Sequence, residues 1–259
     1  MPAPSDPAAR LHVAATHDGI DDRVAVEEPL EIRVGDEAIA VTMRTPGHDE
    51  ELAVGFLHGE GLIGAGDVRG AGPTDDLANN IVVVDADLRS RPAARRFYTT
   101  SSCGVCGKGA LEEVAVHCDP VPDGPVVARE LLADLPDRLA AAQPAFGRTG
   151  GLHATGLFDA AGTLLLARED VGRHNAMDKV IGARALAGAL PLHGHLLCVS
   201  GRVSFELVQK AAVAGVPVLV AVGAPTSLAV QLAGDRNMTL CGFARDGGVN
   251  VYTGAQRVQ

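Results

Sequence analysis

The chain has 259 residues, which is enough for one large domain or two modest ones. Its 22 lysine and arginine residues against 32 aspartate and glutamate residues give a formal charge of −10, which argues against nucleic acid as the main partner. With 47% apolar and 21% charged residues the composition is typical of a folded globular protein and excludes disordered and collagen-like classes.

The N-terminal residues 1–23 are rich in proline, alanine and aspartate and lack the apolar run of a secretion signal, so we expect a disordered tail. Five cysteines in a chain of this length do not indicate a disulfide framework. Residues 211–234 carry no charge, but glycines and prolines interrupt them, which makes a membrane helix the weaker interpretation. The sequence therefore predicts a cytoplasmic protein with no membrane segment.

Residues 24–100 are predicted to form a small α+β domain. The strand-like runs 28–34 and 37–45 are joined by Gly35-Asp36, a two-residue loop of the kind that tight hairpins favour. A helix should follow His48, because acidic side chains occupy its first turn and apolar ones recur at helical spacing. Residues 80–88 and 94–100 indicate two further strands.

Residues 101–149 are predicted to hold a loop with a Cys-x-x-Cys motif and connecting helices, one of them over 128–142 with a kink or break at Pro136. The motif is Cys103-Gly-Val-Cys106, in a glycine- and serine-rich loop that precedes a helix. Such a pair can bind a metal as half of a site, cycle as a dithiol or carry sulfur as a persulfide, and the thiols can also simply pack. Each chemical role needs a thiolate, which Lys108 and the start of a helix would favour.

The metal and redox alternatives are the weaker ones for this pair. A structural zinc would need two more ligands, and the adjacent His117 and Cys118 cannot easily both face one metal from a helix. The zinc site of nucleobase deaminases needs a glutamate where Thr155 stands and a proline where Ser102 stands. A thioredoxin-like motif would follow an early strand of a βαβ unit, whereas the α/β half of this chain begins later. We therefore expect no metal.

Residues 150–259 change to alternating elements and predict a three-layer α/β domain. Apolar strands are expected at 152–158, 163–170, 195–200, 216–222, 238–244 and 249–253, with helices at 174–187, 204–214 and 225–233 between them. Strands separated by single helices imply right-handed crossovers and a mostly parallel sheet covered on both faces.

Two strand-to-helix junctions in this domain carry the sequence Gly-Arg, at Arg173 and Arg202. Ligands of open α/β sheets gather at such junctions, where helix N-termini favour anions and arginines can pair with phosphate oxygens. The alternative for either junction is helix capping with surface ion pairs. Two successive Gly-Arg junctions favour a ligand that bears phosphate.

A third candidate segment precedes the final strand. Its Asp-Gly pair is typical of a hairpin turn, while its arginine and glycine N–H groups could also form an anion cradle. We assign His153, Cys198 and Cys241 mainly to packing. The residues of the segment are Phe243, Ala244, Arg245, Asp246, Gly247 and Gly248.

Several motifs together give the chain a specific resemblance. These motifs are, in chain order, EEPLEIRV, HDEELAVGFLHGEGLI, TSSCGVCGK, EDVGRHNAMDKV, SGRVSFELVQKAAVAGVPVLVAV and TLCGFARDGGVNVYT. With them the chain resembles, from about Val24 to Tyr252, the formate dehydrogenase accessory sulfurtransferases, the FdhD/NarQ family.

The resemblance implies a sulfur carrier that accepts persulfide sulfur from a cysteine desulfurase and passes it to the bis-molybdopterin guanine dinucleotide molybdenum cofactor for formate dehydrogenase. It implies that Cys103 carries the persulfide, that Cys106 assists, and that residues 243–248 contact the cofactor. It also implies a C-terminal domain similar to the cytidine deaminase fold, and a homodimer. A non-catalytic chaperone that only holds the cofactor is the alternative, and a small zinc-binding interaction protein is a third.

Overall fold

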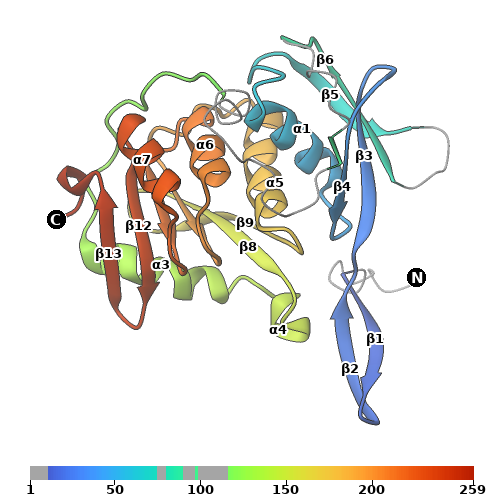
Figure 1. Ribbon diagram of the computed structural model, residues 1–259, viewed down its shortest axis with the longest axis horizontal. Coiled ribbons are helices and arrows are strands. Elements are labelled where there is room, and N and C mark those ends of the chain that lie inside the picture. The colour runs from blue at the N-terminus through green and yellow to red at the C-terminus, as the bar shows by residue number, and fades with distance from the viewer. Residues whose placement is uncertain (1–10, 75–79, 90–96, 99–115) are drawn as a thin grey trace.

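The computed structural model describes residues 11–74, 80–89, 97–98 and 116–259. The Cys-x-x-Cys motif lies outside these residues, so the predictions for Cys103 and Cys106 stay predictions. The described elements form two sheets that meet through helices, with a separate hairpin at one end (Figure 1).

The C-terminal half is built on a six-stranded sheet with the order β13-β12-β11-β10-β8-β9. Only β10, β11 and β12 run parallel to one another, and the other neighbouring pairs are antiparallel. The prediction of a mostly parallel sheet is wrong, because short turns join β8 to β9 and β12 to β13 and such turns impose antiparallel pairing. The strands are β8 His153–Phe158, β9 Leu164–Asp170, β10 Leu196–Val199, β11 Val218–Ala221, β12 Thr239–Arg245 and β13 Gly248–Thr253.

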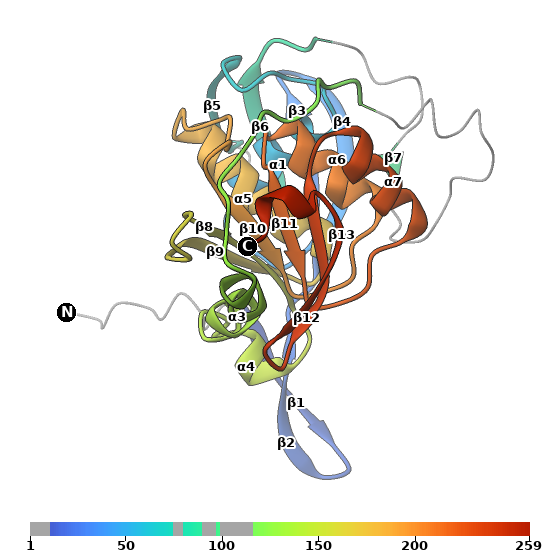
Figure 2. The same cartoon turned by 90° about the vertical axis from the view of Figure 1, so that its left-hand side faces the viewer.

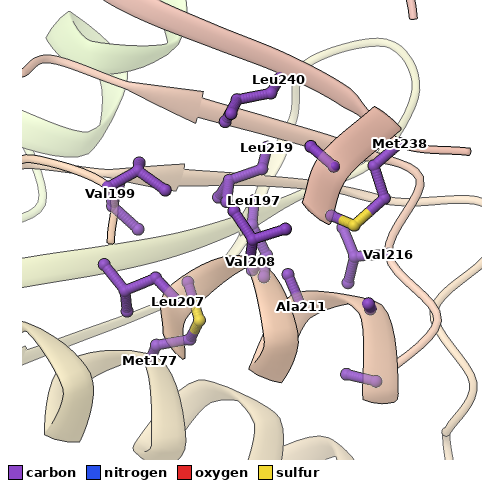
Figure 3. Close-up of a cluster of buried hydrophobic side chains, with 14 of the residues drawn as sticks. Met177, Leu197, Val199, Leu207, Val208, Ala211, Val216, Leu219, Met238 and Leu240 are labelled. Atoms are coloured by element: carbon purple, nitrogen blue, oxygen red, sulfur yellow. The ribbon is translucent and has the colours of Figure 1, made fainter. Parts of the chain in front are cut away.

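Helices cover both faces of this sheet, as the three-layer prediction requires (Figure 2). Along β10 the side chains alternate: Leu197 and Val199 pack with α5, α6 and α7, while Leu196 and Cys198 pack with α3. Figure 3 shows the first of these cores, with Leu207 of α6 beside the strand residues. The helices are α3 Arg129–Ala140, α4 Phe146–Thr149, α5 Arg173–Leu186, α6 Phe205–Val213, α7 Ser227–Asp235 and the 3-10 turn η2 Ala255–Arg257.

Of the two alternatives predicted at Pro136, a kink or a break, the break is wrong, because α3 runs as one helix through this residue. The boundaries of α5, α6 and α7 agree with the predicted ranges to within two residues, whereas α4 and η2 were not predicted.

Among its described residues, the N-terminal half holds a five-stranded sheet with the order β5-β6-β3-β4-β7 and the helix α1. The predicted hairpin around Gly35-Asp36 is confirmed by the antiparallel pairing of β3 with β4. The helix lies between this sheet and α5, so it joins the two halves (Figure 1). The elements are β3 Glu28–Val34, β4 Glu37–Arg44, α1 Asp49–Gly59, β5 Val68–Pro73, β6 Ile81–Ala86 and β7 Phe97–Tyr98.

A hairpin of β1, His12–His17, and β2, Ile20–Ala25, precedes this half and projects from it (Figure 1). The disordered tail predicted for residues 1–23 is therefore wrong from His12 onward. Asp18 and Gly19 form its turn with φ of 51° and 77°, the left-handed pair that two-residue hairpin turns need.

The helices α1 and α5 pack with their backbones in direct contact. A Cβ atom on Gly55 would overlap the backbone carbonyl of Asp178, and one on Gly182 would overlap that of Glu51. Glycine is therefore required on both helices, and the two halves form one closely packed body at this point.

Candidate functional site

The loops that follow the central strands meet at one edge of the six-stranded sheet. The N–H of Gly223 donates to the carbonyl of Gly201 at 3.0 Å, and the N–H of Phe243 donates to the carbonyl of Gly223 at 3.2 Å. These bonds place the segments after β10 and β11 beside the end of β12. We call this region the carboxyl edge; its residues are His153, Arg173, Gly201, Arg202, Gly223 and Phe243.

The start of β8 lies at the same edge because β8 runs antiparallel to β10. A Cβ atom on Gly201 would lie 3.2 Å from His153 Nδ1 and 4.0 Å from Arg173 Cδ. The absence of a side chain at Gly201 therefore lets the imidazole and the arginine approach the loop after β10. Arg202, next in the chain, is exposed.

Positive charge is concentrated at the carboxyl edge although the chain is acidic overall. Partial burial, together with the nearby Arg173, His174 and Arg202, lowers the pKa of His153, and Asp170 opposes them. The Nε atom of Arg173 is buried and has no hydrogen-bond partner among the described residues. An anion beside these groups would supply the missing acceptor and offset the repulsion.

A second histidine lies beside the first at the start of α5. His174 Nε2 is 2.9 Å from Glu206 Oε2 and 3.1 Å from Ser204 Oγ, so it bridges the N-termini of α5 and α6. The hydrogen bond from His174 lowers the pKa of Glu206. The contact between His174 and Glu206 thus holds the two Gly-Arg junctions, at Arg173 and Arg202, at a fixed separation.

A buried aspartate, Asp170, fixes the start of α5 and with it the position of Arg173. Asp170 accepts hydrogen bonds from the backbone N–H groups of Thr45 at 3.1 Å and Gly172 at 2.9 Å, and from Asn175 Nδ2 at 3.0 Å. It also pairs with the buried Lys179. The start of α5 is thereby tied to the end of β4 in the N-terminal half.

The segment that contains residues 243–248 forms the predicted hairpin turn. Asp246 and Gly247 have φ of 53° and 73°, and Arg245 pairs with Gly248. Phe243 also has a positive φ, 52°, at a register shift in β12, and this conformation exposes its ring with the Arg245 guanidinium 5.9 Å from the ring centroid. Ala244 is fully buried in the core with α3, so in this structure it offers a ligand no surface.

The structure thus brings together Arg173, Arg202 and Phe243 at the carboxyl edge, with Arg245 stacked near Phe243. His153 was assigned mainly to packing from the sequence, yet it lies between the two Gly-Arg junctions. Its signal is its place at the start of a strand, two residues after the Gly150-Gly151 pair.

Within the described ranges, no cluster of three or more histidine, cysteine or acidic side chains could hold a metal ion. Within the same ranges, no helix is long and apolar enough to cross a bilayer.

Comparison with known proteins identifies the family. The family model described as FdhD/NarQ family matches residues 25–259, nearly the whole chain. The chain belongs to the FdhD/NarQ family. The resemblance drawn from the motifs is confirmed.

Relatives of this FdhD/NarQ family member carry the name sulfur carrier protein FdhD. The protein of that name from Mycolicibacterium paratuberculosis is 53% identical over 250 residues, which cover 92% of each chain. That from Streptomyces avermitilis is 51% identical over 253 residues, which cover 92% of this chain and 89% of the relative. A crystal structure described as a formate dehydrogenase accessory protein from Desulfotalea psychrophila matches with a TM-score of 0.73 and 25% identity, over 96% of this chain and 97% of that one.

Proposed function

We propose that this family member is a sulfurtransferase that takes persulfide sulfur from a cysteine desulfurase and delivers it to the bis-molybdopterin guanine dinucleotide molybdenum cofactor, which formate dehydrogenase requires. Two observations support this proposal. The Cys-x-x-Cys motif, in a chain about half identical to proteins named sulfur carriers, supports the sulfur chemistry, and the carboxyl edge supports binding of the cofactor. The proposal includes action in the cytoplasm as a homodimer, and a C-terminal domain similar to the cytidine deaminase fold.

The observation that carries cofactor binding is the cationic group at the carboxyl edge. Arg173 has a buried Nε atom without a partner among the described residues, His153 lies beside it, and Arg202 is exposed next to Gly201. The proposed cargo carries pyrophosphates, and arginines at helix N-termini are suited to bind such groups. The net charge of −10 is no obstacle, because the potential at a local cluster decides how a small anion binds.

The sulfur chemistry is assigned to the cysteine pair. The Cys103 thiolate attacks the outer sulfur of the desulfurase persulfide, the S–S bond of the donor breaks, and the donor cysteine leaves as a thiolate. Cys106 then attacks the inner sulfur of the Cys103 persulfide. The pair is oxidised to a disulfide, the transferred sulfur leaves reduced as sulfide for the cargo, and a dithiol reductant restores the two thiols.

The other cysteines of the described ranges are poor nucleophiles by comparison. Burial raises the pKa of the thiols of Cys118, Cys198 and Cys241, to about 12 for Cys241. Cys118 is the least buried of these three and serves as a matched control for chemical labelling.

Intact mass after incubation with a cysteine desulfurase and cysteine tests the sulfur step. The wild-type protein should gain sulfur that maps to the peptide with Cys103, Cys103→Ala should gain none, and Cys118→Ser should behave as wild type. A Cys103→Ala protein that still carries a full complement of labile sulfur would exclude the assignment.

A non-catalytic cofactor chaperone is the second candidate, since it would need the same cationic edge. The two differ at Cys103. Complementation of formate dehydrogenase activity should be lost with Cys103→Ser if sulfur is transferred and kept if the protein only holds the cofactor. Under both candidate functions, calorimetry should show that Arg202→Ala binds GDP more weakly than wild type. An Arg245→Ala protein that binds GDP as wild type does would show that Arg245 is not part of the site.

A further inference from the structure

The β1-β2 hairpin projects from the end of the molecule at which the turn between β12 and β13 lies, in Figure 1 and again in Figure 2. Its base adjoins the carboxyl edge, because a Cβ atom on Gly151 would lie 3.6 Å from the Cβ atom of Ala25. His153 follows Gly151 by two residues, so their Cα atoms are within about 7 Å of each other. Each strand of the hairpin has six residues, about 20 Å when extended. A protein that takes a ligand from the carboxyl edge therefore comes within reach of the hairpin.

The two faces of the hairpin differ in what they contact. One face turns toward α4, since His12 Nε2 is 3.3 Å from Arg148 Nη1. The opposite face carries Val13, Ile20 and Val24, because Val13 is paired with Val24 and alternate residues of a strand share a side. These three side chains are 52%, 60% and 44% exposed. Apolar side chains gathered on a projecting hairpin, which has little stability of its own, are typical of an interaction surface.

The charge of the hairpin identifies the kind of partner. Asp18, Asp21 and Asp22 are exposed, and with Arg23 they give residues 12–25 a formal charge of −2, counting histidine as neutral. Aspartates also protect exposed strands from aggregation, but the apolar face beside them works against that purpose. A protein that receives a cargo bearing pyrophosphates needs a cationic entrance for them. The carboxyl edge would repel such an entrance, whereas the aspartates attract it.

We propose that the outward face of the β1-β2 hairpin docks the protein that receives the cargo, through an apolar contact bordered by basic residues of that protein. The inference rests on the proposed function, in which formate dehydrogenase without its cofactor is the receiver. Val13, Ile20 and Val24 form the apolar part of the contact. Asp22, which strand alternation places between Ile20 and Val24, pairs with a cation of the receiver.

Binding of the full chain to cofactor-free formate dehydrogenase, measured by biolayer interferometry, tests the inference. Val24→Ser should weaken binding by about 5- to 20-fold, because an apolar side chain is lost from the contact. Asp22→Arg should weaken it by about 10-fold or more at low salt and by less at high salt, because the change reverses a charge. Asp235→Arg, the same change at an exposed aspartate at the end of α7, is the matched control and should bind as wild type.

Two further measurements show that the rest of the protein is intact. Val24→Ser and Asp22→Arg should gain sulfur at Cys103 and bind GDP as wild type does, because neither residue belongs to the cysteine pair or to the carboxyl edge. If both variants also bind the dehydrogenase as wild type does, the docking assignment is overturned and the proposed function stands. A wild-type chain that neither gains sulfur nor binds GDP would overturn the proposed function instead.

Three other outcomes would also overturn the docking assignment. Wild-type protein that gains sulfur but does not bind the dehydrogenase would show that the hairpin docks no receiver. Equal weakening in Asp235→Arg would assign the effect to net charge and not to the hairpin. A wild-type dimer that becomes a monomer in Val24→Ser, measured by sedimentation velocity, would assign the apolar face to a second copy of this chain.

Discussion

Asp170 and Lys179 form an ion pair with 2.7 Å between Oδ2 and Nζ, and both side chains are at most 1% exposed. Lys179 also donates to the backbone carbonyl of Thr45 at 2.8 Å, and Asp170 accepts the N–H of the same residue. The pair therefore joins the end of β4 to the start of α5. Because Arg173 begins α5, the same contacts set the place of a cation at the carboxyl edge.

Replacement of Asp170 by asparagine should lower the free energy of unfolding by about 3–5 kcal/mol, since it leaves the buried Lys179 without its counter-ion. Urea denaturation of Asp170→Asn measures this loss. The double variant Asp170→Asn, Lys179→Met should recover part of it, because the uncompensated charge is gone.

The control for that pair is the exposed pair of Arg138 and Asp134 on α3, with 2.7 Å between Nε and Oδ2. Asp134→Asn should change the free energy of unfolding by less than about 1 kcal/mol because solvent screens the pair. Equal losses in Asp134→Asn and Asp170→Asn would show that burial does not set the strength of the Asp170 pair.

The contact between α1 and α5 predicts a steric effect at Gly182. Gly182→Ala would place a Cβ atom against the backbone carbonyl of Glu51, which cannot rotate away, so we expect a loss of about 2–4 kcal/mol despite the better helix propensity of alanine. Gly147 in α4 has open space where its Cβ would lie, and Gly147→Ala should be within about 1 kcal/mol of wild type. The thermal unfolding midpoints of Gly182→Ala and Gly147→Ala, each compared with that of wild type, test this prediction. A Gly182→Ala protein as stable as wild type would contradict the close packing of α1 against α5.

The sequence predicted the parts of this fold that local patterns determine. Helix spacing identified α5 to within one residue, and Gly35-Asp36 identified the β3-β4 turn. The β1-β2 hairpin was missed although Asp18-Gly19 carries a turn signal of the same kind, because the composition of residues 1–23 outweighed it.

The mixed direction of the large sheet and the composition of the site depend on contacts between distant residues. Periodicity reports burial and not strand direction, so the sequence predicted a mostly parallel sheet in which β8 and β10 were not recognised as antiparallel. His153 carries no motif, and only the folded chain brings it beside Gly201 and Arg173. The two Gly-Arg junctions were found because strand ends followed by helices leave a local pattern.

The pair of Glu51 and Arg168 predicts an acid-sensitive contribution to stability. Burial would raise the pKa of Glu51, but hydrogen bonds from Arg168 at 2.6 and 2.7 Å and the contact with His48 outweigh it and lower the pKa to about 2, from 4.5. A lowered carboxyl pKa stabilises the fold above pH 4.5, and the contribution is lost as the pH falls from about 4.5 to about 2.

Glu51→Gln should therefore be less stable than wild type by about 1–3 kcal/mol at pH 7, and the difference should shrink steadily below pH 4.5. Urea denaturation of both proteins at a series of pH values measures it. Glu28→Gln, at a half-exposed partner of Arg44, should cost less than about 1 kcal/mol. A difference for Glu51→Gln that stays constant down to pH 3 would contradict the assignment.

The lowered pKa of His153 predicts that anion binding at the carboxyl edge takes up a proton. Burial, together with the nearby Arg173, His174 and Arg202, lowers the pKa of the free imidazole below its usual value, and Asp170 opposes them. A bound pyrophosphate would offset the charges of Arg173 and Arg202 and raise the pKa of His153. Affinity should then be constant at high pH, rise as the pH falls through the bound-state pKa, and level off below the free-state pKa.

Calorimetric titration with pyrophosphate in two buffers of different ionisation enthalpy measures the number of protons that the protein takes up on binding. We expect an uptake of up to one proton per bound pyrophosphate near pH 6.5. His153→Gln should abolish the uptake because glutamine keeps a polar side chain of similar reach without a titratable group. His195→Gln is the matched control, since burial also lowers the pKa of His195 but this residue precedes β10 at the opposite edge of the sheet. The same proton uptake in His153→Gln as in wild type would assign the coupling to another group, of which His174, already paired with Glu206, is the nearest in the chain to Arg173.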